Sequence, residues 1–168
     1  MTAGIEQSAG RIGAPGVTGA AAMMTGDLAS AAAGIAVNAL GPHTATVSMT
    51  IRPDMANGHG ITHGGYVFML ADTAFACACN SSGAVTVAGG ADITFLAATR
   101  PGDHLTARAE RRSHRGRSGV YDVTVVRSTD TGDEVIAEFR GRSRSLPIPG
   151  GAAPDDPAAD HPDPEAPR

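Results

Sequence analysis

Residues 57–81 read NGHGITHGGYVFMLADTAFACACNS, and this stretch decides the fold. From Gly64 onward it contains no proline and few β-branched residues, and Ser81-Ser82-Gly83 then supplies a stop signal. The sequence therefore predicts one long helix over Gly64–Asn80. Because this helix is apolar nearly all round, we expect it to be buried on most sides.

Strands are predicted on both sides of this helix. His43–Ile51 alternates strictly between apolar and polar residues, which is typical of a half-buried strand. Val85–Phe95 is apolar with β-branched residues and contains the Gly89-Gly90 pair, which indicates a bent or bulged strand. The other expected strands cover residues 33–40, 105–110, 121–126 and 138–144. One buried helix against five to six antiparallel strands is an α+β arrangement in which the sheet wraps the helix.

The composition favours a single domain with a core of small side chains. The chain has 168 residues, its hydrophobic share is 42%, and its aromatic share is only 4%. Both ends lack periodicity and are rich in alanine, glycine or proline. We therefore expect residues 1–19 and 148–168 to be disordered, and residues 20–147 to form the domain.

Charge and cysteine usage argue against several classes of partner. Five of the 17 acidic residues and one of the 13 basic residues lie in the last 18 positions, so the remaining chain is neutral and should attract neither nucleic acid nor membrane. The apolar stretch 17–40 is interrupted by Asp27, and no signal-peptide pattern occurs at the start. Cys77 and Cys79 diverge on the predicted helix and cannot readily pair, which suits a reducing compartment. These features predict a cytoplasmic protein.

Asp72 is the first candidate for a catalytic residue. It is the only Asp, Glu, Lys or Arg between Asp54 and Asp92, and it lies in the middle of an apolar helix. An isolated carboxylate is costly to bury and usually has a raised pKa, so a chain rarely keeps one without a use. The alternative is a structural role, in which Asp72 caps a loop or pairs with an arginine of the core.

The segment that opens the helix is the second candidate. Free backbone N–H groups at a helix start suit a developing oxyanion, and Gly64 and Gly65 would let a substrate carbonyl approach closely. The alternative is that these glycines only make a tight turn. His59 and His63 have a spacing that suggests a metal, but no third ligand is evident. We therefore expect no metal, and a hydrogen bond between His63 and the turn.

The same residues resemble the signature of PaaI-type hotdog thioesterases, which hydrolyse phenylacetyl-CoA or hydroxyphenylacetyl-CoA. The likeness comprises NGHG at 57–60, HGGYVFMLADTAFA at 63–76 and Asn-Ser at 80–81, and it covers about residues 25–146. The resemblance implies a hotdog fold and hydrolysis of acyl-CoA to a free acid and CoA, with phenylacetate catabolism as the setting. It also implies no cofactor beyond the CoA of the substrate, and homodimers that pair into homotetramers.

The resemblance further implies roles for single residues. Asp72 would be the general base or the nucleophile, the Gly64 amide would form the oxyanion hole, and Asn57 would help to position water or substrate. The supporting residues would be His63, Gly65 and Thr73.

Helix geometry adds a constraint on these roles. Gly64 and Asp72 are eight residues apart, which is about 12 Å along one helix axis at a rise of about 1.5 Å per residue. They cannot serve one carbonyl within one chain. We therefore expect a homodimer with shared active sites.

The CoA phosphates need cationic partners. The candidates are Arg100, Arg111, Arg112, Arg115 and Arg117. The alternative for the last four is a solvated hairpin tip, since exposed charges are the default. The family commonly has FLRP where this chain has FLAATRP at 95–101, so its arginine is displaced. Two other functions stay open: a hotdog dehydratase or hydratase that uses His63, and a non-catalytic acyl-CoA-binding protein.

Overall fold

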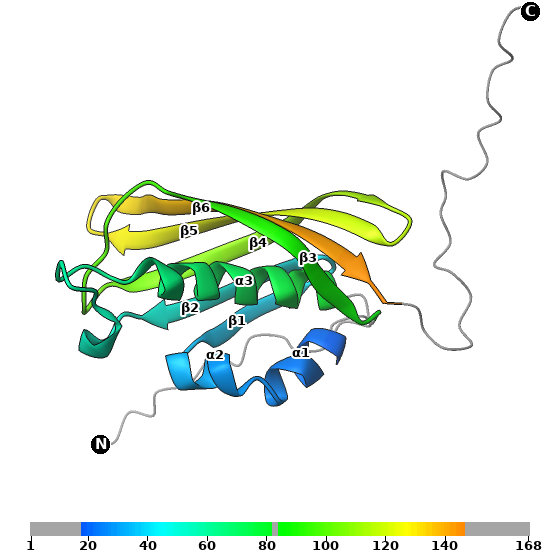
Figure 1. Cartoon of the computed structure of the whole chain (residues 1–168), viewed down its shortest axis with the longest axis horizontal. Coiled ribbons are helices and arrows are strands. Elements are labelled where there is room, and N and C mark those ends of the chain that lie inside the picture. The colour runs from blue at the N-terminus through cyan, green and yellow to red at the C-terminus, as the bar shows by residue number, and fades with distance from the viewer. Residues whose placement is uncertain (1–17, 82–83, 147–168) are drawn as a thin grey trace, which may run out of the picture.

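The computed structural model describes residues 18–81 and 84–146. The strands are β1 (Ala36–Gly41), β2 (Thr44–Thr50), β3 (Thr86–Phe95), β4 (His104–Arg115), β5 (Ser118–Thr129) and β6 (Gly132–Ser145). They form one sheet in the order β1-β2-β4-β5-β6-β3, and every neighbouring pair is antiparallel. The sheet curves around α3 (Gly64–Asn80), as Figure 1 shows. The predicted α+β hotdog arrangement and the bounds of its long helix are confirmed.

The core lies between α3 and the concave face of the sheet. The apolar positions of the predicted alternation in β2, including Val47 and Met49, are buried there. Phe75 of α3 is fully buried, and its ring centroid lies 5.5 Å from that of Tyr121. A Cβ added at Gly141 would come within 2.7 Å of the Phe75 ring, so β6 passes this close to the helix only because Gly141 has no side chain.

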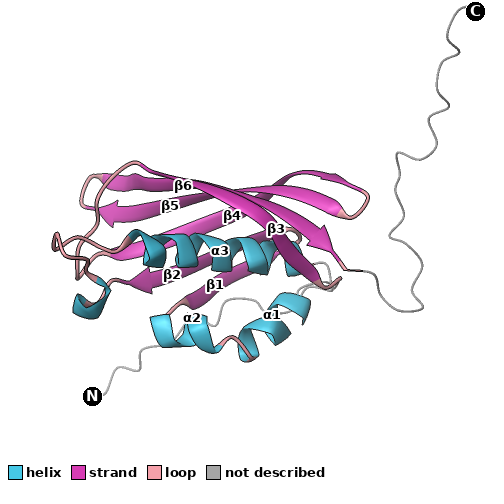
Figure 2. Cartoon of the chain, in the orientation of Figure 1, coloured by secondary structure: helices cyan, strands magenta, loops and turns pink. Residues whose placement is uncertain are grey.

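Two short helices precede the sheet, and the sequence analysis did not predict them. They are α1 (Thr18–Thr25) and α2 (Leu28–Ala33), and both pack beside α3 (Figure 2). Asp27 caps α2 by accepting the Ser30 N–H, and Gly34 ends α2 with a φ of 75°. The strand predicted over 33–40 is therefore wrong at its start, because Ala33 is helical and β1 begins at Ala36.

Strands β4, β5 and β6 are longer than predicted, whereas β2 and β3 are slightly shorter. β4 continues through the arginine-rich segment to Arg115, so Arg111 and Arg112 lie in a strand instead of a loop. The bulge predicted at Gly89-Gly90 is confirmed by a register shift between β3 and β6 after Ala88. None of the helices within 18–81 and 84–146 is long and apolar enough to cross a membrane.

The predicted disordered ends fall almost entirely outside the described residues. Helix α1 begins at Thr18, two residues before the expected start of the domain at residue 20. Residues 1–17 and 147–168 lie outside the described part of the chain.

Candidate active site

The start of α3 holds two glycine amides with different partners. The Gly65 N–H donates to Nδ1 of His63, the N-cap residue, at 3.0 Å. The expected hydrogen bond between His63 and the turn is thus present. The Gly64 N–H donates to no group in the described residues. One amide at the positive end of the helix dipole is therefore free to bind a ligand oxygen.

Asn57 supplies a second free donor. Its side-chain Oδ1 accepts the His59 N–H at 2.9 Å, and its backbone N–H donates to the Ile61 carbonyl at 2.8 Å. These contacts fix Asn57 in a tight turn and occupy the side-chain oxygen. The Nδ2 amide group donates to no acceptor within the described part of the chain.

The structure brings Asn57 and Gly64 together in one cavity of about 360 Å³. This Asn57–Gly64 cavity is also lined by Ile61, Thr62, Val67 and residues 95–99. The Phe95 ring lies against Gly64, since a Cβ added there would be 3.1 Å from the ring. Phe95 keeps 52% of its surface exposed. The walls are mainly apolar, which suits an acyl group beside the two free donors.

Asp72 is half-buried on α3 and does not line the Asn57–Gly64 cavity. Burial raises the pKa of its carboxyl above the ordinary value. Within residues 18–81 and 84–146 the carboxyl makes no hydrogen bond or ion pair. The described residues therefore provide neither of the structural roles considered for it, a loop cap or a core arginine pair.

A half-buried stripe surrounds Asp72. Phe68, Met69 and Ala76 lie three or four residues from Asp72 and are also only half-buried, whereas the intervening Leu70, Ala74 and other core positions are fully covered. The helix thus presents one incompletely covered, largely apolar face with a single carboxyl in it.

Thr73 does not reach the Asp72 carboxyl. Its Oγ1 lies 2.8 Å from the Met69 carbonyl oxygen and 3.0 Å from Ser30 Oγ. Ser30 Oγ is in turn 2.6 Å from the Asp27 carboxylate. The Thr73 hydroxyl therefore ties α3 to α2, a contact that the sequence analysis missed because it did not predict α2.

The predicted basic residues divide into two groups. Arg100 lies in the loop that follows the cavity wall. Its backbone N–H donates to Asp103 Oδ2 at 2.9 Å. Arg111 lies seven residues along β4 from His104, which is about 23 Å of strand. Figure 1 shows the β4–β5 hairpin at the other end of the sheet from that loop. The arginines of the hairpin are therefore not brought to the cavity of their own chain.

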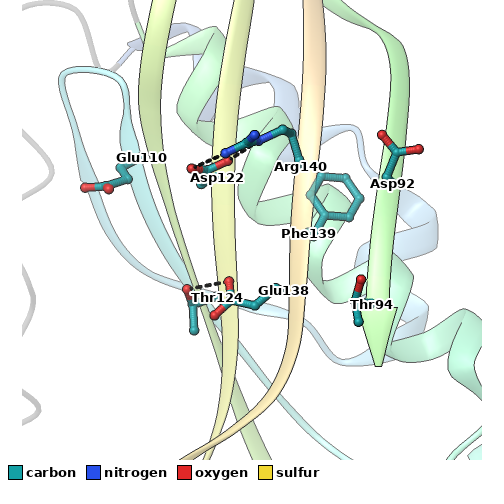
Figure 3. A pocket seen from close by; sticks show the side chains of 8 residues that line it. All are labelled: Asp92, Thr94, Glu110, Asp122, Thr124, Glu138, Phe139 and Arg140. Carbon is teal, nitrogen blue, oxygen red and sulfur yellow. Dashed lines mark hydrogen bonds and ion pairs between the residues drawn. The ribbon is translucent and has the colours of Figure 1, made fainter. Parts of the chain in front are cut away.

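Arg112 already has carboxylate partners. Its Nε lies 3.2 Å from Asp122 Oδ2 and its Nη1 lies 3.9 Å from Glu110 Oε1, on the outer face of the sheet. Asp122 also holds Arg140 through two hydrogen bonds of 2.7 and 2.9 Å. A shallow groove of about 440 Å³ runs over this face (Figure 3). Among the described residues, no group of three or more His, Cys, Asp or Glu side chains is placed to hold a metal ion.

Comparison with known proteins identifies the family. Residues 59–133 match the family model of the thioesterase superfamily. The chain is also 42% identical over 125 residues to the acyl-coenzyme A thioesterase PaaI of Escherichia coli, across 74% of this chain and 87% of that protein. The chain belongs to the thioesterase superfamily.

Solved structures agree with this assignment. The E. coli PaaI protein from the phenylacetic acid degradation operon superposes on the thioesterase with a TM-score of 0.73 and 41% identity, across 77% of this chain and 92% of that one. The TT0310 protein from Thermus thermophilus superposes with a TM-score of 0.65 and 33% sequence identity, across 70% of this chain and 96% of that one. The resemblance to PaaI-type thioesterases is confirmed, and this thioesterase is a thioester hydrolase.

Proposed function

We propose that this thioesterase hydrolyses acyl-CoA thioesters to a free acid and CoA, with phenylacetyl-CoA and related aryl thioesters as substrates in phenylacetate catabolism. The relative from E. coli is named an acyl-coenzyme A thioesterase. The observation that carries the proposal is the free Gly64 N–H at the start of α3, beside Asn57 in an apolar cavity. Such a donor suits the oxygen of a thioester carbonyl.

The chemistry follows from these donors and from Asp72. The thioester oxygen accepts hydrogen bonds from the Gly64 N–H and the Asn57 Nδ2 amine, which stabilise the negative charge of the tetrahedral intermediate. Asp72 either removes a proton from the attacking water or attacks the carbonyl carbon itself. The carbon–sulfur bond then breaks, and CoA leaves as a thiolate that takes up the proton removed from water in the first route, or a proton from solvent in the second. In the second route water then hydrolyses the mixed anhydride between the acyl group and Asp72, which releases the free acid and restores the carboxylate. Incorporation of ¹⁸O from solvent into Asp72 during a single turnover would indicate the direct attack.

Each site is proposed to form between two subunits. Asp72 does not line the cavity of its own chain, so the acid would come from the partner subunit. Strand β3 supports this assembly, because it pairs only with β6 in the described sheet and exposes Val87 along its edge. Unpaired edges invite pairing with another chain. The half-buried stripe around Asp72 would be covered in the same dimer, and two dimers would form a tetramer in the cytoplasm.

Arg100 is proposed as the first contact for the CoA phosphates, because it lies closest in sequence to the cavity wall. Reversing its charge should raise KM for an acyl-CoA but not for the same acyl group on N-acetylcysteamine, which has no phosphate. An equal rise for both thioesters would assign Arg100 a structural role. The same comparison for Arg111 and Arg112 tests the contribution of the hairpin.

The experiment that tests the function is thiol release by the purified protein, followed with a disulfide reagent. Asp72→Asn and Asp72→Ala should each lower kcat/KM by about 10²- to 10⁴-fold. Asp133→Asn is the matched control, because Asp133 is an exposed carboxylate that pairs with Arg108. If no aryl- or acyl-CoA is cleaved, or if both Asp72 variants keep full activity, the proposal is wrong.

A further inference from the structure

The loop between β3 and β4, residues 96–103, forms one wall of the Asn57–Gly64 cavity through its first half, Leu96–Thr99. The Leu96 N–H donates to the Ile136 carbonyl at 2.8 Å, which holds the start of the loop. Thr99 is buried, and its Oγ1 lies 2.6 Å from Oγ1 of Thr62. The Thr62 N–H also donates to the Thr99 carbonyl at 2.8 Å. The middle of the loop is thus joined to the turn that leads into α3.

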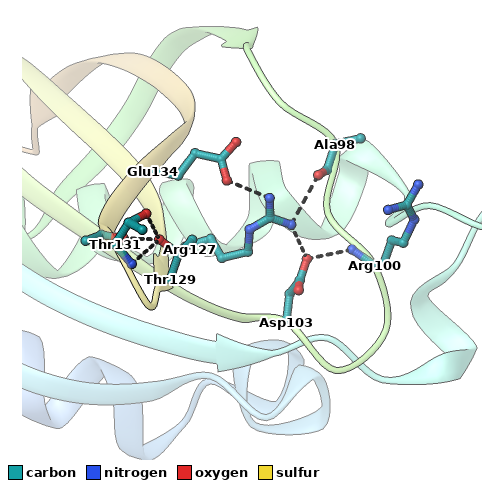
Figure 4. Close-up of polar contacts among 8 residues, drawn as sticks. Ala98, Arg100, Asp103, Arg127, Thr129, Thr131 and Glu134 are labelled. Carbon is teal, nitrogen blue, oxygen red and sulfur yellow. Dashed lines mark hydrogen bonds and ion pairs between the residues drawn. The ribbon is translucent and has the colours of Figure 1, made fainter.

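Arg127 of β5 holds the rest of this loop from the side (Figure 4). Its Nη1 donates to Asp103 Oδ2 at 2.7 Å and lies 3.5 Å from the Ala98 carbonyl oxygen. Its Nη2 donates to Glu134 at 2.6 Å, so β6 anchors the other side of the guanidinium. One side chain therefore connects the cavity wall at Ala98, the end of the loop at Asp103, and the sheet.

The strength of this contact comes from partial burial and from two donors on one oxygen. The side chains of Arg127 and Asp103 are each only 24% exposed. Asp103 Oδ2 also accepts the Arg100 N–H at 2.9 Å. Burial opposes ionisation of Asp103, but the Arg100 N–H and the Arg127 guanidinium outweigh it and hold the pKa of the carboxyl below its ordinary value. Charge-assisted hydrogen bonds of this kind are stronger than neutral ones.

We propose that Arg127 is a positioning residue for substrate binding. Its guanidinium fixes the 96–103 loop, and thereby fixes the wall that Leu96–Thr99 present to the acyl group. Arg127 does not itself line the cavity, so it acts through the loop. The inference rests on the proposed function, because it requires that the cavity hold the acyl group.

The planar fork of arginine is needed for this role. Arg127 engages Asp103, Glu134 and the Ala98 carbonyl in different directions, whereas lysine presents one compact charge. Lysine at this position should keep one ion pair and lose the others. Arg127→Lys is therefore expected to restore only part of what Arg127→Gln removes.

The first test compares Arg127→Gln, Arg127→Lys and Asp103→Asn with wild type. Arg108→Gln is the control, because it breaks an exposed ion pair of 2.8 Å with Asp133 on the outer face of the sheet. A displaced wall weakens ground-state and transition-state binding alike. KM for phenylacetyl-CoA should therefore rise roughly tenfold in Arg127→Gln and Asp103→Asn, with kcat changed less than about twofold. The KM of Arg127→Lys should lie between the values of wild type and Arg127→Gln. The KM of the control Arg108→Gln should match that of wild type.

The second test measures binding without turnover, by calorimetry with a thioether analogue of phenylacetyl-CoA that cannot be hydrolysed. Kd should rise in the same order as KM. If Arg127→Gln binds the analogue as tightly as Arg108→Gln does, or if kcat falls while KM and Kd stay constant, the positioning role is overturned. Absence of thiol release by wild type would refute the proposed function alone, since the analogue still decides the role of Arg127. Absence of analogue binding by wild type would refute both.

Discussion

Gly64 and Gly65 are neighbours at the start of α3, but their amides face different partners. The Gly65 N–H is bound by the His63 side chain, while the Gly64 N–H is free at the cavity. The sequence indicated a glycine pair suited to an oxyanion but gave no means to distinguish its two amides. That distinction depends on the rotamer of His63, which only the folded turn defines.

Alanine substitutions at these two glycines should affect different properties, activity at Gly64 and stability at Gly65. In Gly64→Ala the new Cβ would lie 3.1 Å from the Phe95 ring, which is half-exposed and can move into the cavity. We expect kcat/KM to fall by about tenfold or more with the melting temperature retained. In Gly65→Ala the new Cβ would lie 3.1 Å from His63 Nδ1, so the cap should weaken by about 1 kcal/mol. Wild-type turnover in Gly64→Ala would contradict the oxyanion role.

The Asp72 carboxyl should lower the free energy of unfolding at neutral pH. Burial raises the pKa of its carboxyl, so the folded state holds the proton more tightly than the unfolded state. The contribution of Asp72 to stability is therefore fully present below the ordinary pKa of 3.8 and is lost as the pH rises through the raised value. Asp72→Asn should be more stable than wild type at pH 7, in urea unfolding at fixed protein concentration, and this advantage should vanish in acid. A less stable variant at pH 7 would indicate a structural role for the carboxylate.

Arg127 illustrates what sequence analysis misses at the residue scale. The sequence marks Asp72 as a catalytic candidate because it is the only charged residue in an apolar run, which is a local signal. Arg127 and Asp103 are 24 residues apart and meet only because β4 and β5 pair in register. Such contacts between neighbouring strands leave no local pattern in the sequence.

Among the elements, the alternating strands and the apolar helix were predicted, while α1 and α2 were not. The caps of α2 were visible in the sequence, since Asp27 precedes this helix and Gly34 follows it. Alanine-rich helical turns have little amphipathic periodicity, so the periodic pattern that marks a longer helix is missing here. Caps are thus a better guide than periodicity for such short helices.

The turn between β1 and β2 should make stability depend on pH. His43 adopts a φ of 57°, and its buried Nδ1 has no partner among the described residues. Burial, Arg111 and His114 lower the pKa of His43 below its ordinary value of 6.5. The unfolded state therefore binds the proton first, and stability should be lost as the pH falls below 6.5.

His43→Asn provides the matched comparison for this effect, because asparagine tolerates the left-handed backbone and does not titrate. The variant should keep its melting temperature between pH 8 and pH 5 better than wild type does. Parallel losses in both proteins would show that His43 is not the group responsible.

The whole molecule separates the parts of the proposed site. The cavity has two donors and an apolar wall, whereas Asp72 lies elsewhere on α3, in a face that the chain leaves half-covered. The fold class could be predicted because hydrophobic periodicity reports burial directly. The dimer could only be inferred, from the rise of one helix, because a partner leaves no separate pattern in a single chain.

Complementation between two inactive variants tests the shared site most directly. Asp72→Asn and Asn57→Ala protomers are mixed, unfolded together and refolded, and thiol release from phenylacetyl-CoA is measured against each variant refolded alone. A site built from two subunits predicts recovery of about a quarter of wild-type activity, since half of the dimers are mixed and each mixed dimer has one intact site. If the mixture is no more active than the separate variants, while mixed dimers are shown to form, the shared site is contradicted.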